Sequence, residues 1–138
     1  MTDRQIEINR LLRSLPLECT KEITPASKEN IAIFKKKAEE KNIQEGVIDQ
    51  LVDLYIIADN FMYEVILGFH SCTDDIIFEW WQHGELWIGQ RDFNTLRWAN
   101  GKFCLGDAGS ISYSEENEYE SLLDLIEGCI KEILDSTS

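Results

Sequence analysis

The apolar residues of this 138-residue chain change their spacing near Asp59-Asn60, and that change limits the folds open to it. Before this point they recur at intervals of three and four, which is typical of amphipathic helices. From there to about residue 105, runs rich in β-branched and aromatic residues are typical of strands. A helical spacing returns toward the C-terminus. We therefore predict an α+β fold with helices first, then a mostly antiparallel sheet of about five or six strands, then a closing helix.

Three amphipathic helices are expected before residue 60. Thr2 followed by Gln5 forms a capping-box pattern for the first. Its apolar face comprises Ile6, Leu11, Leu12 and Leu15. Ser27 is a suitable N-cap for a second helix that runs to about Lys41. A third helix over 45–58 carries an apolar stripe of Val47, Leu51, Leu54, Tyr55 and Ala58.

The middle of the chain predicts about five consecutive strands. Their expected ranges are 62–69, 76–81, 86–91, 95–98 and 102–105. Asn100-Gly101 separates the last two and predicts a two-residue hairpin, because both residue types tolerate the positive φ of a type I′ turn. Ser114, or Ser121 with Asp124, is expected to cap an amphipathic C-terminal helix packed on the sheet. No linker or repeat divides the sequence, so residues 1–138 are expected to form one domain.

The charge of the chain is strongly negative and unevenly spread. The formal net charge is −13, and residues 1–41 carry a net +2 while residues 42–138 carry −15. Direct binding of nucleic acid or of an anionic membrane surface is therefore disfavoured. A basic protein is the partner that such a field attracts and orients. The alternative is that the acidity only keeps the protein soluble.

The N-terminal residues and the cysteines favour a reducing compartment. MTDRQIEINRLLRSL has no continuous apolar run, so we expect no secretory signal and a cytoplasmic protein. The cysteines, Cys19, Cys72, Cys104 and Cys129, are widely scattered without a Cys-x-x-Cys motif. We expect buried free thiols rather than a disulfide framework. The protein is expected to be a monomer or a weak dimer.

Residues suited to catalysis are sparse. His70, Cys72 and His83 are the one group with metal-ligand or nucleophile chemistry, and their spacing does not match a common zinc motif. Glycine motifs that cradle phosphate are absent from the sequence. We therefore expect no enzymatic activity, no metal and no cofactor. A small hydrolase or metalloprotein that uses these three residues is the alternative.

Two adjacent tryptophans suggest a binding anchor. If 76–81 is a regular strand, Trp80 and Trp81 point to opposite faces of the sheet, and one of them faces outward. Tryptophan is enriched at the energetic centres of protein interfaces. The alternative is an aromatic core covered on both faces.

Residues 24–61, TPASKENIAIFKKKAEEKNIQEGVIDQLVDLYIIADNF, resemble the opening of the SUKH superfamily, which includes Syd and the yeast glucan-synthesis regulators. The residues that carry the resemblance are Ala26, Ser27, Ile31, Phe34, Leu51, Leu54, Tyr55, Asn60 and Phe61. The strand block and the acidic segment before the last helix extend it to about residue 135. The resemblance implies an α+β fold, no enzymatic activity, and the role of an immunity protein that neutralises a polymorphic or contact-dependent toxin, often a nuclease. A regulatory scaffold of the glucan-synthesis-regulator type is the alternative role.

A partner-binding surface is expected at acidic or aromatic residues in predicted turns and at strand ends. We expect it to include Asp59, Asn60, the outward member of Trp80 and Trp81, Asp92, Glu115, Glu116 and Glu118.

Overall fold

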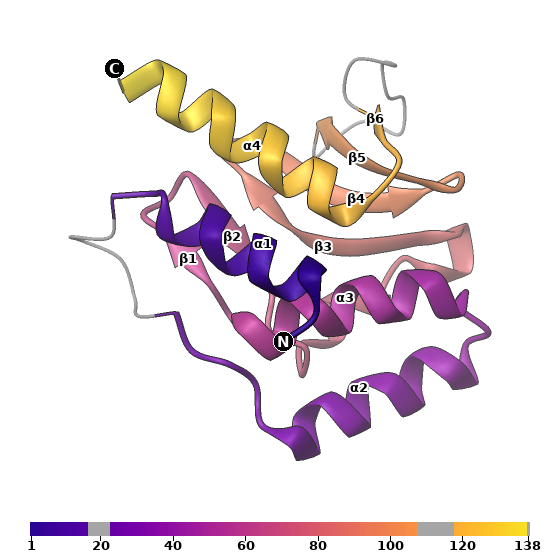
Figure 1. Ribbon diagram of the computed structural model, residues 1–138. Coiled ribbons are helices and arrows are strands. Elements are labelled where there is room, and N and C mark those ends of the chain that lie inside the picture. Colours follow the sequence, from indigo (N-terminus) through magenta and orange to yellow (C-terminus); the bar gives the residue numbers. More distant parts are fainter. Residues whose placement is uncertain (17–22, 108–117, 138) are drawn as a thin grey trace.

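Helices precede and follow a block of strands in the computed structural model of the chain, which describes residues 1–16, 23–107 and 118–137 (Figure 1). The helices of this part are α1 (Asp3–Arg13), α2 (Lys28–Glu40), α3 (Glu45–Ile57) and α4 (Leu122–Thr137). The strands are β1 (Met62–Tyr63), β2 (Leu67–Phe69), β3 (Glu85–Arg91), β4 (Asn94–Ala99), β5 (Lys102–Asp107) and β6 (Glu118–Tyr119). Each strand pairs antiparallel with the next, so the order in the six-stranded sheet is the order in the chain. The α+β prediction is confirmed.

The helix starts follow the predicted caps. The backbone N–H of Gln5 donates to Thr2 Oγ1 at 3.2 Å, and the N–H of Asn30 donates to Ser27 Oγ at 3.1 Å. The apolar face of α1 differs at one position, because Ile6 is 49% exposed while Ile8 is fully buried. Within the described residues, no helix is long and apolar enough to span a bilayer.

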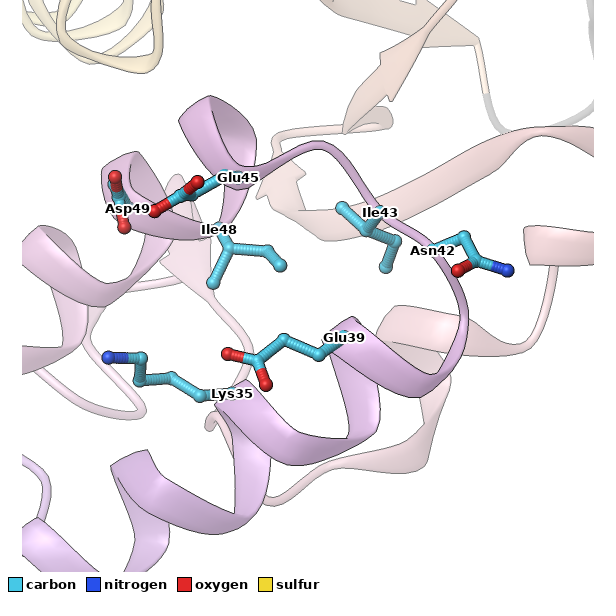
Figure 2. Close-up of a pocket in the computed structure, with 7 residues that line it drawn as sticks. All are labelled: Lys35, Glu39, Asn42, Ile43, Glu45, Ile48 and Asp49. Atoms are coloured by element: carbon cyan, nitrogen blue, oxygen red, sulfur yellow. The ribbon is translucent and has the colours of Figure 1, made fainter.

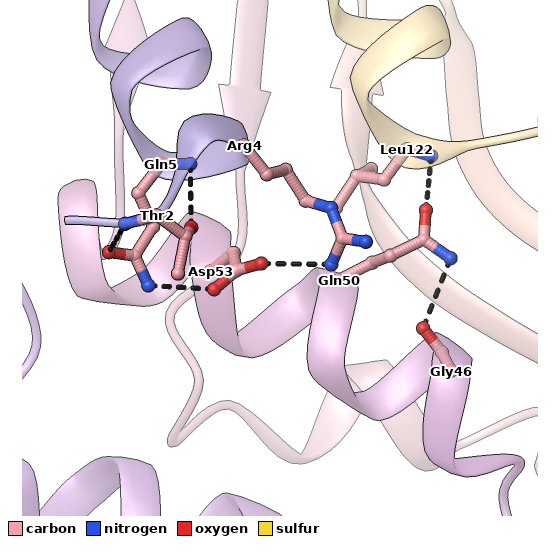
Figure 3. A network of polar contacts seen from close by, with 7 residues as sticks. All are labelled: Thr2, Arg4, Gln5, Gly46, Gln50, Asp53 and Leu122. Atoms are coloured by element: carbon pink, nitrogen blue, oxygen red, sulfur yellow. Dashed lines mark hydrogen bonds and ion pairs between the residues drawn. The ribbon is translucent and has the colours of Figure 1, made fainter.

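Polar contacts join three helices around α3 (Figure 3). Asp53 accepts hydrogen bonds from Gln5 Nε2 at 2.7 Å and from Arg4 Nη1 at 2.8 Å, both on α1. Gln50, one turn earlier in α3, accepts the backbone N–H of Leu122 at 2.9 Å. The first N–H groups of a helix have no partner within it, so Gln50 satisfies one such donor of α4. These bonds set the positions of α1 and α4 relative to α3.

The two faces of the sheet differ in chemistry. One row of cross-strand neighbours is apolar and belongs to the core with residues of α1, α3 and α4: Leu86, Trp98, Phe103 and Tyr119. Figure 1 shows α1 and α4 side by side on this face, with α2 on the outer side of α3. Side chains alternate between the faces of a strand, so the adjacent row points the other way. It comprises Trp87, Arg97, Cys104 and Glu118.

The turn between β4 and β5 is the predicted hairpin. Asn100 has φ 54° and Gly101 has φ 78°, the positive values that a type I′ turn requires. Ala99 pairs with Lys102 directly across this turn, which sets the register of both strands.

The predicted strand over 76–81 is wrong. The chain forms two short 3-10 helices there, η1 (Asp75–Phe78) and η2 (Trp81–His83). The Asp74 carboxylate accepts the backbone N–H two residues ahead at 3.1 Å, which favours a turn over an extended chain. The apolar residues are buried without a strand: Ile77 is fully buried, and Phe78 stacks on Phe34 of α2 with ring centroids 5.7 Å apart.

The predicted strand over 62–69 is also interrupted. Glu64 has φ 50°, and the N–H of Ile66 donates to the Tyr63 carbonyl at 3.1 Å, which closes a turn between β1 and β2. Non-glycine residues adopt this left-handed conformation infrequently, so the residue types around Glu64 did not indicate the turn.

The backbones of β2 and β3 approach closely at a pair of glycines. A Cβ built on Gly89 would lie 2.0 Å from the carbonyl oxygen of Gly68, which is far inside a van der Waals contact. Gly89 pairs with Phe69 across the strands and lies beside a register shift that follows Trp87. The sheet at this point therefore requires a residue without a side chain.

Replacing Gly89 by Ala should lower the free energy of unfolding by roughly 3 kcal/mol, because the backbone of β2 must move away. Gly46→Ala is the matched control, since a Cβ on Gly46 in α3 would meet no atom within 4 Å. That control should leave stability unchanged or raise it by up to about 1 kcal/mol. Urea unfolding followed by tryptophan fluorescence measures both. Equal stability of Gly89→Ala and wild type would contradict the close approach.

Candidate protein-binding site

An exposed tryptophan marks the face of the sheet that points away from the core row. Trp80 is 38% exposed, and its ring stacks on Trp87 of β3 with centroids 5.2 Å apart and an interplanar angle of 23°. The Trp80 carbonyl accepts the backbone N–H of His83 at 3.0 Å and that of Glu85 at 3.3 Å. These bonds reverse the chain between η2 and β3 and hold Trp80 over the start of the strand.

Trp87 is held in place by a charged pair. The guanidinium carbon of Arg97 lies 4.3 Å from the centroid of the Trp87 ring, a cation–π contact. Glu85 Oε1 accepts from Arg97 Nη1 at 3.2 Å and from the indole N–H of Trp87 at 3.0 Å. Arg97 Nε donates to Thr95 Oγ1 at 2.6 Å. One carboxylate thus fixes both the cation and the ring that covers it.

The side chain of Arg97 is only 2% exposed, whereas that of Glu85 is 15% exposed. Burying an arginine is unfavourable unless its charge and its donors find partners, so the position of Glu85 is tightly constrained. We call Trp80, Trp87, Glu85 and Arg97 the tryptophan shelf. Its exposed ring rests on a base with little freedom to move, which lowers the entropy lost when a partner packs against it.

The structure brings two of the predicted contact residues onto this face. Trp80 belongs to the shelf, and Glu118 lies in the same cross-strand row as Trp87 and Arg97, three strands away from Trp87. At about 4.8 Å between strands, Glu118 is roughly 14 Å from Trp87. Glu118 is exposed, so its carboxylate adds negative charge at the far end of this row.

Trp81 does not contribute to this face. It is half-buried on the helix side, where its ring lies 6.1 Å from that of Trp98, and its indole N–H donates to the Lys41 carbonyl at 3.0 Å. The two tryptophans do point in different directions, but the cause is the 3-10 helix η2, which Trp80 precedes and Trp81 begins, rather than the alternation of a strand.

Asp59, Asn60 and Asp92 lie elsewhere. Asp59 is half-buried and accepts from the backbone N–H of Cys72 at 2.8 Å and from Ser71 Oγ at 3.1 Å, so it stabilises a loop. Asn60 and Asp92 are exposed, each with positive φ, and Asp92 lies in the turn at the opposite end of β3 from the shelf. The remaining predicted residues, Glu115 and Glu116, are outside the described part of the chain.

The group formed by His70, Cys72 and His83 gains no support as a reactive site. Among the described residues, no cluster of His, Cys, Asp or Glu is arranged to hold a metal ion. Burial, followed by the nearby Asp59 carboxylate, raises the pKa of Cys72 to about 12, so the group is a thiol at neutral pH and a poor nucleophile. Burial also lowers the pKa of His70, which favours the neutral imidazole.

A shallow groove of about 490 Å³ separates α2 from α3 (Figure 2). It is lined by Lys35, Glu39, Asn42, Ile43, Glu45, Ile48 and Asp49. Figure 2 shows Lys35 and Glu39 extending from α2 toward the gap, with Ile48 reaching it from α3. The groove's charged residues are exposed, and exposed charges contribute little to binding. The tryptophan shelf is therefore the stronger candidate.

Sequence reasoning missed Trp87, Glu85 and Arg97. A usable signal was present, because the Asn100-Gly101 hairpin sets the pairing of β4 with β5 and so places Arg97 opposite Cys104 on the face away from Trp98. The pairing of Arg97 with Trp87 required the register of β3, and β3 contains a shift beside Gly89, a residue type that can mark a bulge but does not define the register.

Comparison of the chain with models of protein families, with curated protein sequences and with solved structures gives no match. The resemblance to the SUKH superfamily therefore stays a prediction.

The buried thiols generate a prediction about alkaline stability. Burial is the largest cause that raises the pKa of each of Cys72, Cys104 and Cys129 to about 12. In the unfolded chain these thiols ionise near their ordinary value of about 8.5. The unfolded state therefore loses protons first as pH rises, so the contribution of the thiols to stability should be constant below about pH 8 and should fall progressively toward pH 12.

Urea midpoints measured at pH 7.5, 9 and 10.5 test this decline. A Cys72→Ala/Cys129→Ala variant is the control, and its midpoint should fall less steeply over the same interval. A wild-type midpoint that does not change up to pH 10.5 would show that the thiols ionise equally in both states.

Proposed function

We propose that this protein is a non-enzymatic binding module that grips another protein through the tryptophan shelf. The observation that carries the proposal is the exposed Trp80 ring stacked on Trp87, which is itself fixed by Arg97 and Glu85. A large, rigid aromatic surface with acidic residues around it has the composition of an interface centre. The proposal assigns no catalytic residue and no cofactor.

The charge of the chain supports a basic partner. The net charge of −13 gives a field that attracts a positively charged protein and speeds its association. On the shelf face the buried cation Arg97 pairs with Glu85, while Glu118 on the same face and Glu79, next to Trp80 in the sequence, are exposed. A partner therefore meets negative charge around an aromatic centre.

In its most specific form, the proposal is an immunity protein that neutralises a toxin domain by binding it. The resemblance of residues 24–135 to the SUKH superfamily supports this role. An acidic protein that covers the basic, nucleic-acid-facing surface of a nuclease is physically reasonable, because that surface is where negative charge binds best. A signalling protein as partner would instead favour a regulatory scaffold.

We propose a cytoplasmic location. Cys72, Cys104 and Cys129 are free and buried, which suits a reducing compartment.

Replacing Trp80 by Ala should weaken binding of the natural partner by about 30-fold or more, as expected for an interface centre worth about 2 kcal/mol. The partner is first isolated with the tagged wild-type protein from the native cell and identified by mass spectrometry. Its affinity for each purified variant is then measured by calorimetry.

Ile33→Ala is the matched control, because Ile33 is an apolar residue of α2 that is 50% exposed. It should bind like wild type. A Trp80→Ala variant that folds normally and binds with unchanged affinity would exclude the shelf as the contact.

Replacing Glu118 by Lys should slow association with the same partner several-fold at low salt and flatten the dependence of the association rate on ionic strength. Glu29→Lys makes the same change of charge at the start of α2 and should have a smaller effect. Stopped-flow measurements between 20 and about 300 mM salt compare the two variants. Identical salt dependence for wild type and Glu118→Lys would contradict electrostatic steering toward this face.

A further inference from the structure

Two β-turns lie side by side at the end of the sheet that is farthest from the shelf. The backbone N–H of Asp92, in the β3–β4 turn, donates to the carbonyl of Ile66, in the β1–β2 turn, at 2.7 Å. The ladder between β2 and β3 ends with the pairing of Leu67 and Arg91. The hydrogen bond between Asp92 and Ile66 lies one residue beyond that pair, in the same register. Val65 precedes Ile66 in one of these joined turns, and Phe93 follows Asp92 in the other. We call these two residues the apolar tip.

The apolar tip is unusually exposed. Val65 is 82% exposed and Phe93 is 92% exposed, so folding buries almost none of their apolar surface. Turns normally carry polar residues or glycine, although single apolar side chains scattered over a surface are common. Here two large ones lie on turns that a hydrogen bond joins, and exposed apolar groups near one another are typical of an interaction site.

The base of the tip is held firmly. Glu64 and Asp92 adopt left-handed backbone conformations with φ of 50° and 53°, which non-glycine residues adopt infrequently. Arg91, at the end of β3, forms an ion pair of 2.6 Å with Glu132 of α4. The backbones of the two turns are thus joined to each other, and the end of β3 is joined to α4.

The charges around the tip select its partner. Glu64 and Asp92 are exposed carboxylates next to Val65 and Phe93, while the nearby Arg91 is engaged by Glu132. Two copies of this chain meeting tip to tip would bring these carboxylates together, and an anionic lipid surface would repel them. A protein segment with apolar side chains and neighbouring Lys or Arg residues fits both features.

We propose that the apolar tip is a second docking surface, which binds a basic, apolar peptide segment of a partner protein. It lies at the opposite end of β3 from the tryptophan shelf, a seven-residue strand that spans roughly 20 Å. The inference stands on the exposure and charge of the two turns and is independent of the immunity role.

Selection from a phage-displayed library of random 16-residue peptides tests the tip without knowledge of the natural partner. The full-length wild-type protein is the bait, and Val65→Ser/Phe93→Ser is the counter-selection. Enriched peptides should combine Lys or Arg with aliphatic or aromatic residues. Synthetic versions should bind the wild type at least tenfold more tightly than the double variant, and binding should weaken with salt.

Two controls distinguish binding at the tip from a loss of folding and from binding at the shelf. The double variant should unfold at the same temperature as wild type or higher, because it removes only exposed apolar groups. Trp80→Ala should bind the selected peptides like wild type, so failure of the tip and failure of the shelf give different results.

Three outcomes would overturn the proposal. One is a selection whose peptides bind wild type and double variant equally, or that enriches no peptide. Another is co-sedimentation with phosphatidylglycerol vesicles that the double variant loses, which would indicate a lipid surface instead. The third is a dimer in analytical ultracentrifugation that the double variant abolishes, which would indicate self-association.

Discussion

The apolar row across β3, β4, β5 and β6 is the feature on which the rest of the structure depends. Leu86, Trp98, Phe103 and Tyr119 are buried or half-buried together with residues of α1, α3 and α4. Strands alternate their side chains strictly between the two faces. Once this row is buried beneath the helices, the intervening residues must point the other way. The tryptophan shelf is therefore a consequence of how the core is packed.

The burial of Arg97 restricts how the side chains of the outward-facing row can be arranged. A buried guanidinium requires a counter-charge and acceptors, which Glu85 and Thr95 supply, while Trp87 covers its face. These requirements leave few arrangements for the residues around it, so the surface that Trp80 completes is rigid. By contrast, the charged residues of the groove between α2 and α3 are exposed, and nothing comparable restricts them.

The tryptophan shelf and the apolar tip lie at opposite ends of β3, and both have acidic residues near them. Glu118 adds a carboxylate on the shelf face, and Glu64 and Asp92 flank the tip. Positive charge in both places is engaged, through Arg97 with Glu85 and through Arg91 with Glu132. The described part of the molecule thus presents exposed apolar side chains within a negative field, which is a suitable surface for binding basic proteins.

Features that depend on neighbours in sequence could be predicted from the sequence. The α+β class, the helix starts at Thr2 and Ser27 and the hairpin at Asn100-Gly101 follow from residue spacing, from caps and from backbone preferences, all of which act within a few residues. The sequence did not determine which of Trp80 and Trp81 faces outward, and that prediction depended on a strand that does not form.

Contacts between distant residues were decided by the tertiary structure. Ile77 and Phe78 have residue types typical of a strand, yet they pack in a 3-10 turn because Phe34 and the core bury them there without sheet pairing. The shelf and the tip likewise required the registers of β2, β3 and β4, which bring together residues from separate turns. Short-range preferences do not specify such pairings, because their free energy comes from burial and hydrogen bonds that exist only after the chain has folded.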